Sequence, residues 1–311
     1  MKGKRVAVTG GAGFIGSNLA DELATGNSVI IIDDLSAGRK ENIVSLIEKD
    51  NVRFIKGSIL DLSLLQEAFR GVDFVFHLAA LPSVPRSIKD PQATNEVNIT
   101  GTLNVLLAAR DNNVKQVIYA SSSSVYGDTP TLPKREDMPP NPRSPYALTK
   151  LVGEYYCHIF HQIYALPTTC LRYFNIYGMR QNPDSQYAAV IPRFVARVSR
   201  DEPPIIYGDG EQTRDFTFVR DAVEATILAA ESDASGVFNI GSGNRITIND
   251  LAKLIARLLA TSAKPIYQEP RPGDIRHSLA DISKARNFGY NPKYSLEAGL
   301  TETVRSFQHE T

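Results

Sequence analysis

The chain opens with the stretch RVAVTGGAGFIGSNLADELA (residues 5–24), in which an apolar run is followed by a glycine-rich turn and then by a helical pattern. Arg5 to Thr9 predicts a buried strand, and Phe14 to Ala24 predicts a helix. The glycines between them suit a tight turn whose backbone approaches other groups closely. This stretch therefore predicts the first strand and helix of a βαβ unit.

The same alternation of short apolar runs and amphipathic stretches continues through the first half of the chain. Strands are expected at Ser28–Asp33, Val52–Lys56, Phe74–Ala79, Gln116–Ser121 and Thr168–Phe174, and helices at Leu62–Arg70, Gln92–Asn112 and Pro145–Tyr164. The strand segments are apolar throughout, which indicates that helices cover both faces of the sheet. The fold class predicted is α/β, a doubly wound parallel sheet.

The pattern changes after Phe174, where proline and glycine interrupt shorter segments. Gly236–Gly241 predicts one more strand of the sheet, and Thr247–Leu259 a helix that begins with Thr247 and Asp250 at capping-box spacing. We expect two interleaved units. The first comprises residues 1–174 and about 215–241, and the second, a smaller substrate lobe, comprises about 175–214 and 242–311.

The composition of the chain bounds its partners and its compartment. Its 311 residues contain 34 basic and 34 acidic side chains, so bulk charge gives no case for nucleic acid or a membrane surface as partner. Cys157 and Cys170 are the two cysteines, and no secretory leader or long apolar run stands out, which favours the cytoplasm and buried thiols. His158 and His161 lack further convergent ligands, so no metal site is expected.

The glycine turn has the context of a dinucleotide site. Gly10, Gly13 and Gly16 precede a helix whose free N–H groups attract a pyrophosphate. Asp33 ends the next strand, close to the spacing of about 20 residues expected for an acid that binds ribose. A carboxylate accepts hydrogen bonds from the 2′-hydroxyl of NAD and repels the 2′-phosphate of NADP, so NAD is the predicted cofactor.

A second group of polar residues lies between Ser121 and Lys150. Tyr146 and Lys150 are four residues apart in a helical pattern and therefore share a face, while the serines follow a predicted strand. A free tyrosine ionises near pH 10, so it needs a nearby cation to act as a base at neutral pH. The combination predicts a proton-transfer site beside the dinucleotide.

These motifs together resemble the extended short-chain dehydrogenase/reductase family, and within it the nucleotide-sugar 4-epimerases similar to UDP-galactose 4-epimerase. The resemblance covers essentially the whole chain through TGGAGFIGS, HLAA, SSSSVYGD, YALTK, LRYFNIYG, GDGEQTRDF and RPGD. It implies a Rossmann-type sheet, tightly bound NAD and reversible inversion at C4 of a UDP-sugar through a 4-keto intermediate. The catalytic residues that it implies are Ser122, Tyr146 and Lys150.

The resemblance also implies two sets of binding residues. The cofactor set is Gly10, Gly13, Phe14, Ile15, Gly16, Asp33, Asp34, Ser58, Ile59, Leu78, Ala79, Ala80, Asn98, Tyr146, Lys150 and Tyr173. The substrate set is Ser122, Ser123, Ser124, Tyr146, Asn175, Gln181, Ala189, Val190, Tyr207, Arg214, Arg271, Asp274 and Ser278. Arg214 and Arg271 are expected at the diphosphate, because guanidinium geometry suits phosphate oxygens.

Some positions depart from the family pattern and bear on the substrate. Ser278 stands where galactose enzymes of the family carry a bulky tyrosine, which favours UDP-GlcNAc and UDP-GalNAc, with UDP-Glc and UDP-Gal also accepted. Pro82 occupies a site often held by lysine or glycine. Ser124 lacks the carboxylate of a decarboxylase. A UDP-glucuronate 4-epimerase, another nucleotide-sugar enzyme of the superfamily and a non-catalytic NAD-sensing regulator remain open alternatives.

The resemblance implies a homodimer as well. The two long helical patterns would pair across a twofold axis in a four-helix interface. Candidate contact residues are Leu103, Leu107, Tyr155 and Ile159.

Overall fold

The computed structural model describes residues 1–182, 189–270 and 275–309. Seven parallel strands form the main sheet in the order β11-β6-β5-β4-β1-β2-β3. Their bounds are β1 Arg5–Thr9, β2 Ser28–Asp33, β3 Val52–Lys56, β4 Phe74–His77, β5 Gln116–Ser122, β6 Thr168–Tyr173 and β11 Gly236–Ile240. The doubly wound parallel sheet predicted from the sequence is confirmed.

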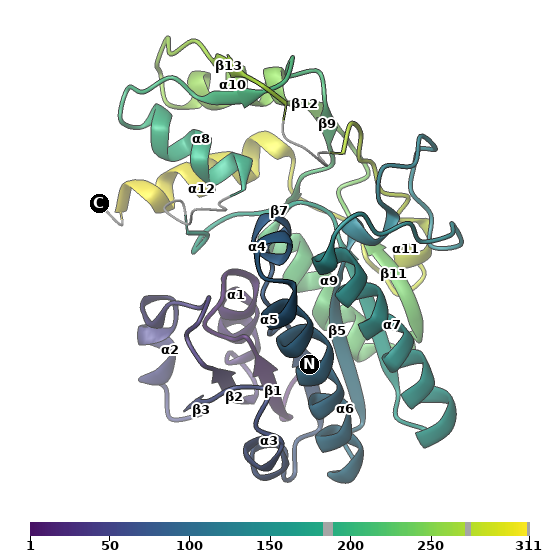
Figure 1. The fold of residues 1–311 in the computed structure, drawn as a ribbon. Helices are drawn as coiled ribbons and strands as arrows, with labels where there is room; N and C mark the ends of the chain where they lie inside the picture. The colour runs from purple at the N-terminus through teal and green to yellow at the C-terminus, as the bar shows by residue number, and fades with distance from the viewer. Residues whose placement is uncertain (183–188, 271–274, 310–311) are drawn as a thin grey trace.

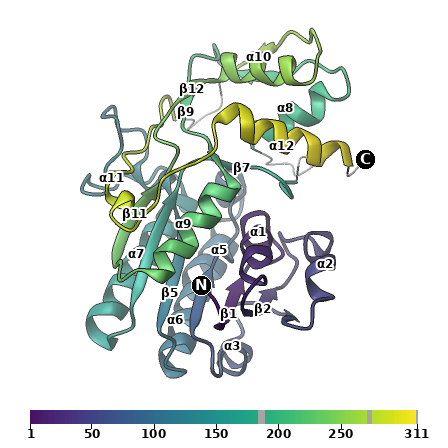
Figure 2. The same cartoon turned by 180° about the vertical axis from the view of Figure 1, so that it is seen from behind.

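Helices cover both faces of this sheet, as the apolar strands required. The helices around it are α1 Phe14–Leu23, α2 Val44–Ile47, α3 Leu62–Ala68, α4 Val84–Lys89, α5 Pro91–Asn95, α6 Gly101–Asp111, α7 Pro145–Tyr164 and α9 Val219–Glu231. The helices α5, α6 and α7 lie on the face seen in Figure 1, and α1 and α9 on the face seen in Figure 2.

Alternate residues of one strand belong to the two opposite cores. Val6 and Val8 pack with α1 and α9, whereas Ala7 between them packs with α3, α6 and α7. All three residues are fully buried. A strand with both faces covered gains from an apolar residue at every position, which is why its sequence shows no alternation.

The later part of the chain adds short elements at the carboxyl ends of the strands. Their bounds are β7 Ile176–Tyr177, α8 Val190–Val198, β8 Ile205–Tyr207, β9 Thr213–Arg214, β10 Thr217–Phe218, β12 Ile246–Thr247, α10 Ile248–Leu258, β13 Ile266–Gln268, α11 Ser283–Arg286 and α12 Leu296–His309. Helices α8, α10 and α12 gather above the sheet in Figure 1. The domain boundaries expected from the sequence stay a prediction.

Local signals explain where two important helices begin. Ser144 accepts a hydrogen bond from the Ala147 N–H, and Pro145 stands at the first turn, where its missing N–H costs nothing, so α7 begins as predicted. Thr247 likewise caps α10 by accepting from the Asp250 N–H. Both helices therefore start where the sequence indicated.

The helix expected at Gln92–Asn112 contains a break that the sequence did not predict. Residues Glu96–Thr100 form a π-helical turn between α5 and α6. A π turn inserts one residue into the helical repeat, so the side chains after it change face relative to those before it. Asn98 lies in this turn and is almost fully buried.

None of the described helices combines the length and the apolar character needed to cross a lipid bilayer. Cys157 and Cys170 are free thiols, and both are buried.

Candidate active site

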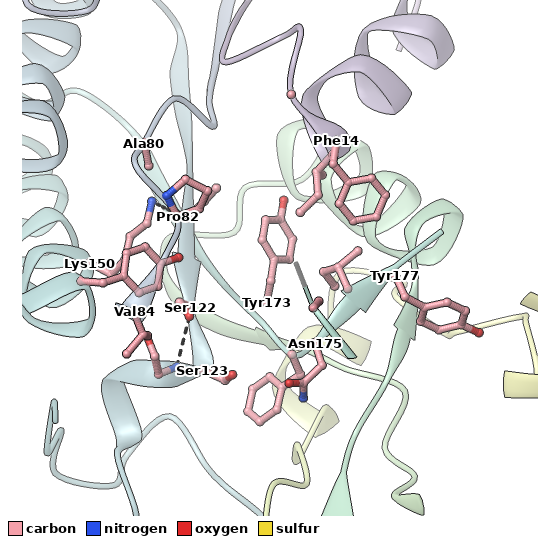
Figure 3. Close-up of a pocket in the computed structure, with 18 of the residues that line it drawn as sticks. Phe14, Ala80, Pro82, Val84, Ser122, Ser123, Lys150, Tyr173, Asn175 and Tyr177 are labelled. Atoms are coloured by element: carbon pink, nitrogen blue, oxygen red, sulfur yellow. Dashed lines mark hydrogen bonds between the residues drawn. The ribbon is translucent and has the colours of Figure 1, made fainter. Parts of the chain in front are cut away.

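A cavity of about 1180 Å³ lies at the carboxyl ends of the parallel strands, the usual position for a ligand site in an open α/β sheet. The predicted residues on its wall are Gly10, Gly13, Phe14, Ile15, Gly16, Asp33, Asp34, Ile59, Leu78, Ala79, Ala80, Ser122, Ser123, Ser124, Tyr146, Lys150, Tyr173, Asn175, Ala189, Val190, Tyr207, Arg214 and Ser278. Figure 3 shows Lys150, Ser122 and Ser123 across the cavity from Phe14, Tyr173 and Asn175.

The glycine turn leaves room that a larger residue would fill. Gly10 has φ +71°, and a Cβ there would lie 2.6 Å from the backbone nitrogen of Ala79. A Cβ on Gly16 would collide with the carbonyl of Gly10. Strand β1, the turn and the end of β4 therefore meet at backbone contact, and an extended diphosphate can approach the main chain there.

The N-terminus of α1 offers hydrogen-bond donors to an anion. Gly13 precedes the helix without a side-chain cap, and no acidic residue stands in the first turn. Phe14, Ile15 and Gly16 of that turn all line the cavity. Since the first N–H groups of a helix lack intrahelical acceptors and carry a partial positive charge, they suit a pyrophosphate.

Asp33 is held in place at the end of β2. Its two carboxylate oxygens accept hydrogen bonds from the Ala12 N–H at 3.0 Å and the Leu35 N–H at 2.8 Å. Burial raises the pKa of Asp33, and these two hydrogen bonds oppose the rise. Each carboxylate oxygen keeps a second lone pair, so Asp33 is fitted to accept from ribose hydroxyls.

Ser122, Tyr146 and Lys150 come together as predicted. The Ser122 hydroxyl and the Tyr146 phenol lie close together on the wall of the cavity. Burial raises the pKa of Tyr146 to about 12, and the nearby Ser122 hydroxyl opposes this rise. Burial also lowers the pKa of Lys150 to about 8. The Lys150 ammonium donates to the carbonyl of Ala120 at 2.7 Å and lies 4.9 Å from the centroid of the Tyr119 ring.

A buried chain of hydrogen bonds supports the strand ends under the cavity. His77 contacts the Thr9 hydroxyl at 2.8 Å through Nδ1 and the Thr102 hydroxyl at 2.9 Å through Nε2. Because Thr102 donates its own proton to the Asn98 carbonyl, it must accept from His77, which places the proton on Nε2. Burial lowers the pKa of His77 to about 3, so the ring stays neutral.

Three predicted binding residues lie behind the wall of the cavity. Asn98 accepts from the Leu81 N–H at 2.8 Å and donates to the Thr149 hydroxyl at 3.0 Å, so it joins the loop after β4 to α7. Ser58 accepts from the Leu60 N–H, while its neighbour Ile59 lines the wall. Gln181 donates to the Ile176 carbonyl at 3.4 Å. Their contacts with ligands stay predictions, as do those of Arg271 and Asp274, which lie outside the described residues.

Several wall residues were not anticipated from the sequence. They include Lys134, Gln212 and His277, together with Val84 and Ile88 of α4. Lys134 comes from the proline-rich loop between β5 and α7, whose backbone pairs with the segment after Ser278. No local pattern signals such a long-range pairing, so sequence reasoning had no means of finding it.

Comparison with known proteins shows the family to which this chain belongs. The model of the NAD dependent epimerase/dehydratase family matches residues 6–241. The chain belongs to this family.

Relatives of this family match the chain over nearly its full length. The UDP-glucose 4-epimerase of Mycolicibacterium smegmatis is 40% identical over 313 residues, with 99% of each chain covered. A solved UDP-N-acetylglucosamine 4-epimerase from Methanobrevibacter ruminantium M1, in complex with UDP-N-acetylmuramic acid, is 45% identical, with a TM-score of 0.97 and full coverage of both chains. The prediction of an NAD-dependent enzyme related to nucleotide-sugar 4-epimerases is confirmed.

A third relative carries both ligands expected for this cavity. It is a UDP-glucuronic acid 4-epimerase from Bacillus cereus, solved with UDP-glucuronic acid and NAD, 35% identical, with a TM-score of 0.90 and coverage of 99% and 100%. As a family member, the protein uses NAD, which supplies and takes up hydride at the sugar carbon when bound. The cradle of Gly10, α1 and Asp33 fits that cofactor.

We predict that Gly10→Ala greatly weakens NAD binding. The new Cβ would displace the Leu78–Ala79 backbone, in addition to about 1–2 kcal/mol of strain from the left-handed conformation. NAD released by acid denaturation of purified protein measures the bound cofactor. Gly3→Ala is the matched control, because Gly3 also has positive φ (+65°) but has no neighbour within 4 Å of its Cβ position. Equal NAD content in both variants would contradict the close-approach argument.

Proposed function

We propose that the protein is a UDP-hexose 4-epimerase with tightly held NAD, and that Tyr146 is its base. The observation that carries this proposal is the gathering of Tyr146, Ser122 and Lys150 on the wall of the same cavity as the glycine turn. A hydroxyl beside a phenol on a cavity wall can also reach a substrate hydroxyl. The roles of all three residues agree with those implied by the family resemblance.

The proposed proton transfer follows from the charges of Tyr146 and Lys150. The Tyr146 phenolate takes the proton of the sugar 4-hydroxyl, and Ser122 hydrogen-bonds that oxygen. The Lys150 ammonium stabilises the phenolate electrostatically, since an opposite charge lowers the pKa of a phenol. After rotation of the 4-keto sugar in the cavity, Tyr146 returns the proton to the new alcohol, so the protein ends the cycle unchanged.

We further propose that 2-acetamido sugars are the preferred substrates. Ser278 and Ala189 are small side chains on the wall of the cavity, and they leave space for an acetamido group. The M. ruminantium relative, named for UDP-N-acetylglucosamine and solved with an acetamido sugar nucleotide, supports this choice. The B. cereus relative keeps UDP-glucuronic acid as the second candidate. Arg214 is proposed at the diphosphate.

Incubation of the purified protein with UDP-GlcNAc, UDP-Glc and UDP-GlcA, each alone and without added NAD, tests the function. We expect inversion at C4, followed by proton NMR, to be fastest for UDP-GlcNAc. Tyr146→Phe should reduce turnover by about 10²–10⁴-fold while bound NAD is kept, because the phenyl ring fills the same space without a transferable proton. Undiminished turnover would remove Tyr146 from the mechanism.

The small wall at Ser278 makes a separate prediction. Ser278→Tyr should lower kcat/KM for UDP-GlcNAc by roughly tenfold or more and leave that for UDP-Glc nearly unchanged, because a phenol ring would occupy the acetamido space. Ser278→Ala is the control for loss of the hydroxyl and should keep both activities. If Ser278→Tyr lowers both activities equally, Ser278 does not select the sugar.

We also propose a homodimer built on α6 and α7. Leu148, Tyr155, Ile159 and Ile163 form an exposed apolar stripe along α7, and Ile163 is 69% exposed. Leu103 and Leu107 of α6 pack against the neighbouring core. An apolar stripe of this length on one helix is typical of an interface that a second molecule covers.

Ile159→Glu should yield monomers, because the dimer would bury the new charge. Light scattering coupled to size-exclusion chromatography measures the mass. Ile266→Glu is the matched control, since Ile266 is an exposed isoleucine on β13, away from the stripe. If the wild type is itself monomeric, or if both variants stay dimeric, the α7 stripe is not the interface.

A further inference from the structure

A buried ion pair lies directly behind the catalytic residues. Glu154 of α7 and Arg172 of β6 each have side chains only 4% exposed. Arg172 donates from Nε to Oε1 at 2.8 Å and from Nη2 to Oε2 at 2.7 Å. The Ser121 hydroxyl donates to the same Oε1 at 2.5 Å. The Arg172 guanidinium also lies 4.6 Å from the centroid of the Tyr126 ring.

This pair belongs to a regular set of contacts between α7 and the end of β5. Three consecutive residues of the strand, Ala120, Ser121 and Ser122, face three α7 residues spaced four apart. Lys150 donates to the Ala120 carbonyl, Glu154 accepts from the Ser121 hydroxyl, and Tyr146 lies beside Ser122. Glu154 is the one furthest from the start of α7, and the other two are the proposed catalytic residues.

Arg172 extends the same link to the next strand. It pairs with Ser121 in the register of β5 and β6, so the guanidinium lies beside the serine that shares its carboxylate. The residue after it, Tyr173, lines the cavity and bonds to Thr226 of α9. The ion pair therefore joins one helix and two strands that all supply residues to the wall.

Stability alone does not account for charges at this place. Removing two ions from water costs several kcal/mol each, and an apolar pair of similar volume is often as stable. The pair does have two effects that apolar side chains would lack. Its bidentate geometry fixes the rotation of α7 against β6, and its opposite charges offset each other's field at Lys150 and Tyr146.

We propose that Glu154, Arg172 and Ser121 form a positioning unit that sets the alignment and the electrostatic balance of Tyr146, Lys150 and Ser122. Glu154 and Arg172 lie behind the wall of the cavity and act only through residues that line it, and Ser121 joins them to that wall. The inference rests on the proposed role of Tyr146 as base. The proposal adds that the action of this base depends on the buried Glu154–Arg172 ion pair.

Other titratable groups face the same region. They are Cys157 on α7, Tyr119 on β5, Tyr126 after it, Cys170 on β6 and His77 on β4. Burial raises the pKa of Tyr119 well above its ordinary value and that of Tyr126 to about 12. A hydrogen bond with Cys157, followed by burial, raises the pKa of Cys170. Burial lowers that of His77 to about 3. Arg172 and Glu154 therefore dominate the fixed charge there.

The two single charge deletions make opposite predictions. Glu154→Gln leaves Arg172 as an uncompensated cation, which favours the phenolate of Tyr146 and the neutral amine of Lys150. Both limbs of the pH profile of kcat should move to lower pH, by about half a unit to one unit. Arg172→Gln leaves an uncompensated anion and should move both limbs to higher pH. The double variant has no net change in charge and should return the limbs towards the wild type.

Ser121→Ala separates alignment from charge. It removes one hydrogen bond without changing any charge, so kcat should fall by about tenfold or more, with KM for the UDP-sugar and both limbs unchanged. Asp221→Asn is the control for the loss of a buried carboxylate. Asp221 is 1% exposed, and its charge raises the pKa values of Tyr177 and Tyr290, not those of Tyr146 and Lys150. Its loss should therefore lower the melting temperature and leave both limbs of the pH profile of kcat in place.

The experiment measures kcat and KM from about pH 6 to pH 10 on folded, NAD-loaded protein, with the UDP-sugar that the wild type turns over fastest. Opposite shifts for the single variants, reversed in the double variant, support the proposal. Limbs that stay at the wild-type pH, or that move in the same direction for both singles, overturn it. If one of the single charge variants does not fold, Ser121→Ala provides the test. A wild-type kcat for Ser121→Ala would overturn the proposal that the unit aligns the catalytic residues. The identity of the base is tested separately by Tyr146→Phe.

Discussion

Backbone contact between the glycine turn and the end of β4 is the constraint on which the cofactor end depends. No side chain fits between Gly10 and Ala79. The two strand ends must therefore be held in register, and the chain from Thr9 through His77 to Thr102 does this with directed hydrogen bonds. Thr102 in turn bonds to Asn98 in the π turn. The hydrogen bonds beneath the glycine turn thus hold the strand ends in place, so the turn itself can consist of glycine and alanine.

Desolvation shifts the pKa values of Tyr146 and Lys150 in opposite directions, and this difference shapes the site. Burial raises the pKa of Tyr146 to about 12 and lowers that of Lys150 to about 8, since each loses the water that stabilises its charged form. The Lys150 ammonium donates to the Ala120 carbonyl, and both Lys150 and Tyr146 line the cavity. In the proposed chemistry the ammonium offsets the cost of forming the phenolate, because an opposite charge favours the ionised form.

The main sheet and many residues on the wall of the cavity could be predicted from the sequence. The π turn at Asn98 and the position of Lys134 could not. The apolar strands and the cap at Ser144 are local signals, so β1, β2, β3 and α7 have the predicted bounds. Residues in contiguous motifs, such as Gly10 and Tyr146, reach the wall because the strand ends share one edge. The π turn at Asn98 has no local signature, and Lys134 reaches the wall through pairing with a segment more than a hundred residues away. Tertiary pairing decides the position of Lys134, and the Asn98 side chain bonds to Leu81 and Thr149, which are distant in the sequence.

The substrate end is organised by one buried carboxylate, where the cofactor end relies on glycine. Asp215 is fully buried and accepts from the Ser242 N–H and hydroxyl, the Gly243 N–H and the Ala280 N–H. Its carbonyl accepts from Asn175 at 2.8 Å. Arg214 precedes it in sequence, and Ser278 is two residues from Ala280. Through its side chain and its carbonyl, Asp215 thus helps to place Asn175, Arg214 and Ser278 on the wall, although Asp215 itself is not on the wall. The proposed loose sugar recognition is compatible with this arrangement, because Ser278 on the wall is small while the backbone near it is held by buried hydrogen bonds.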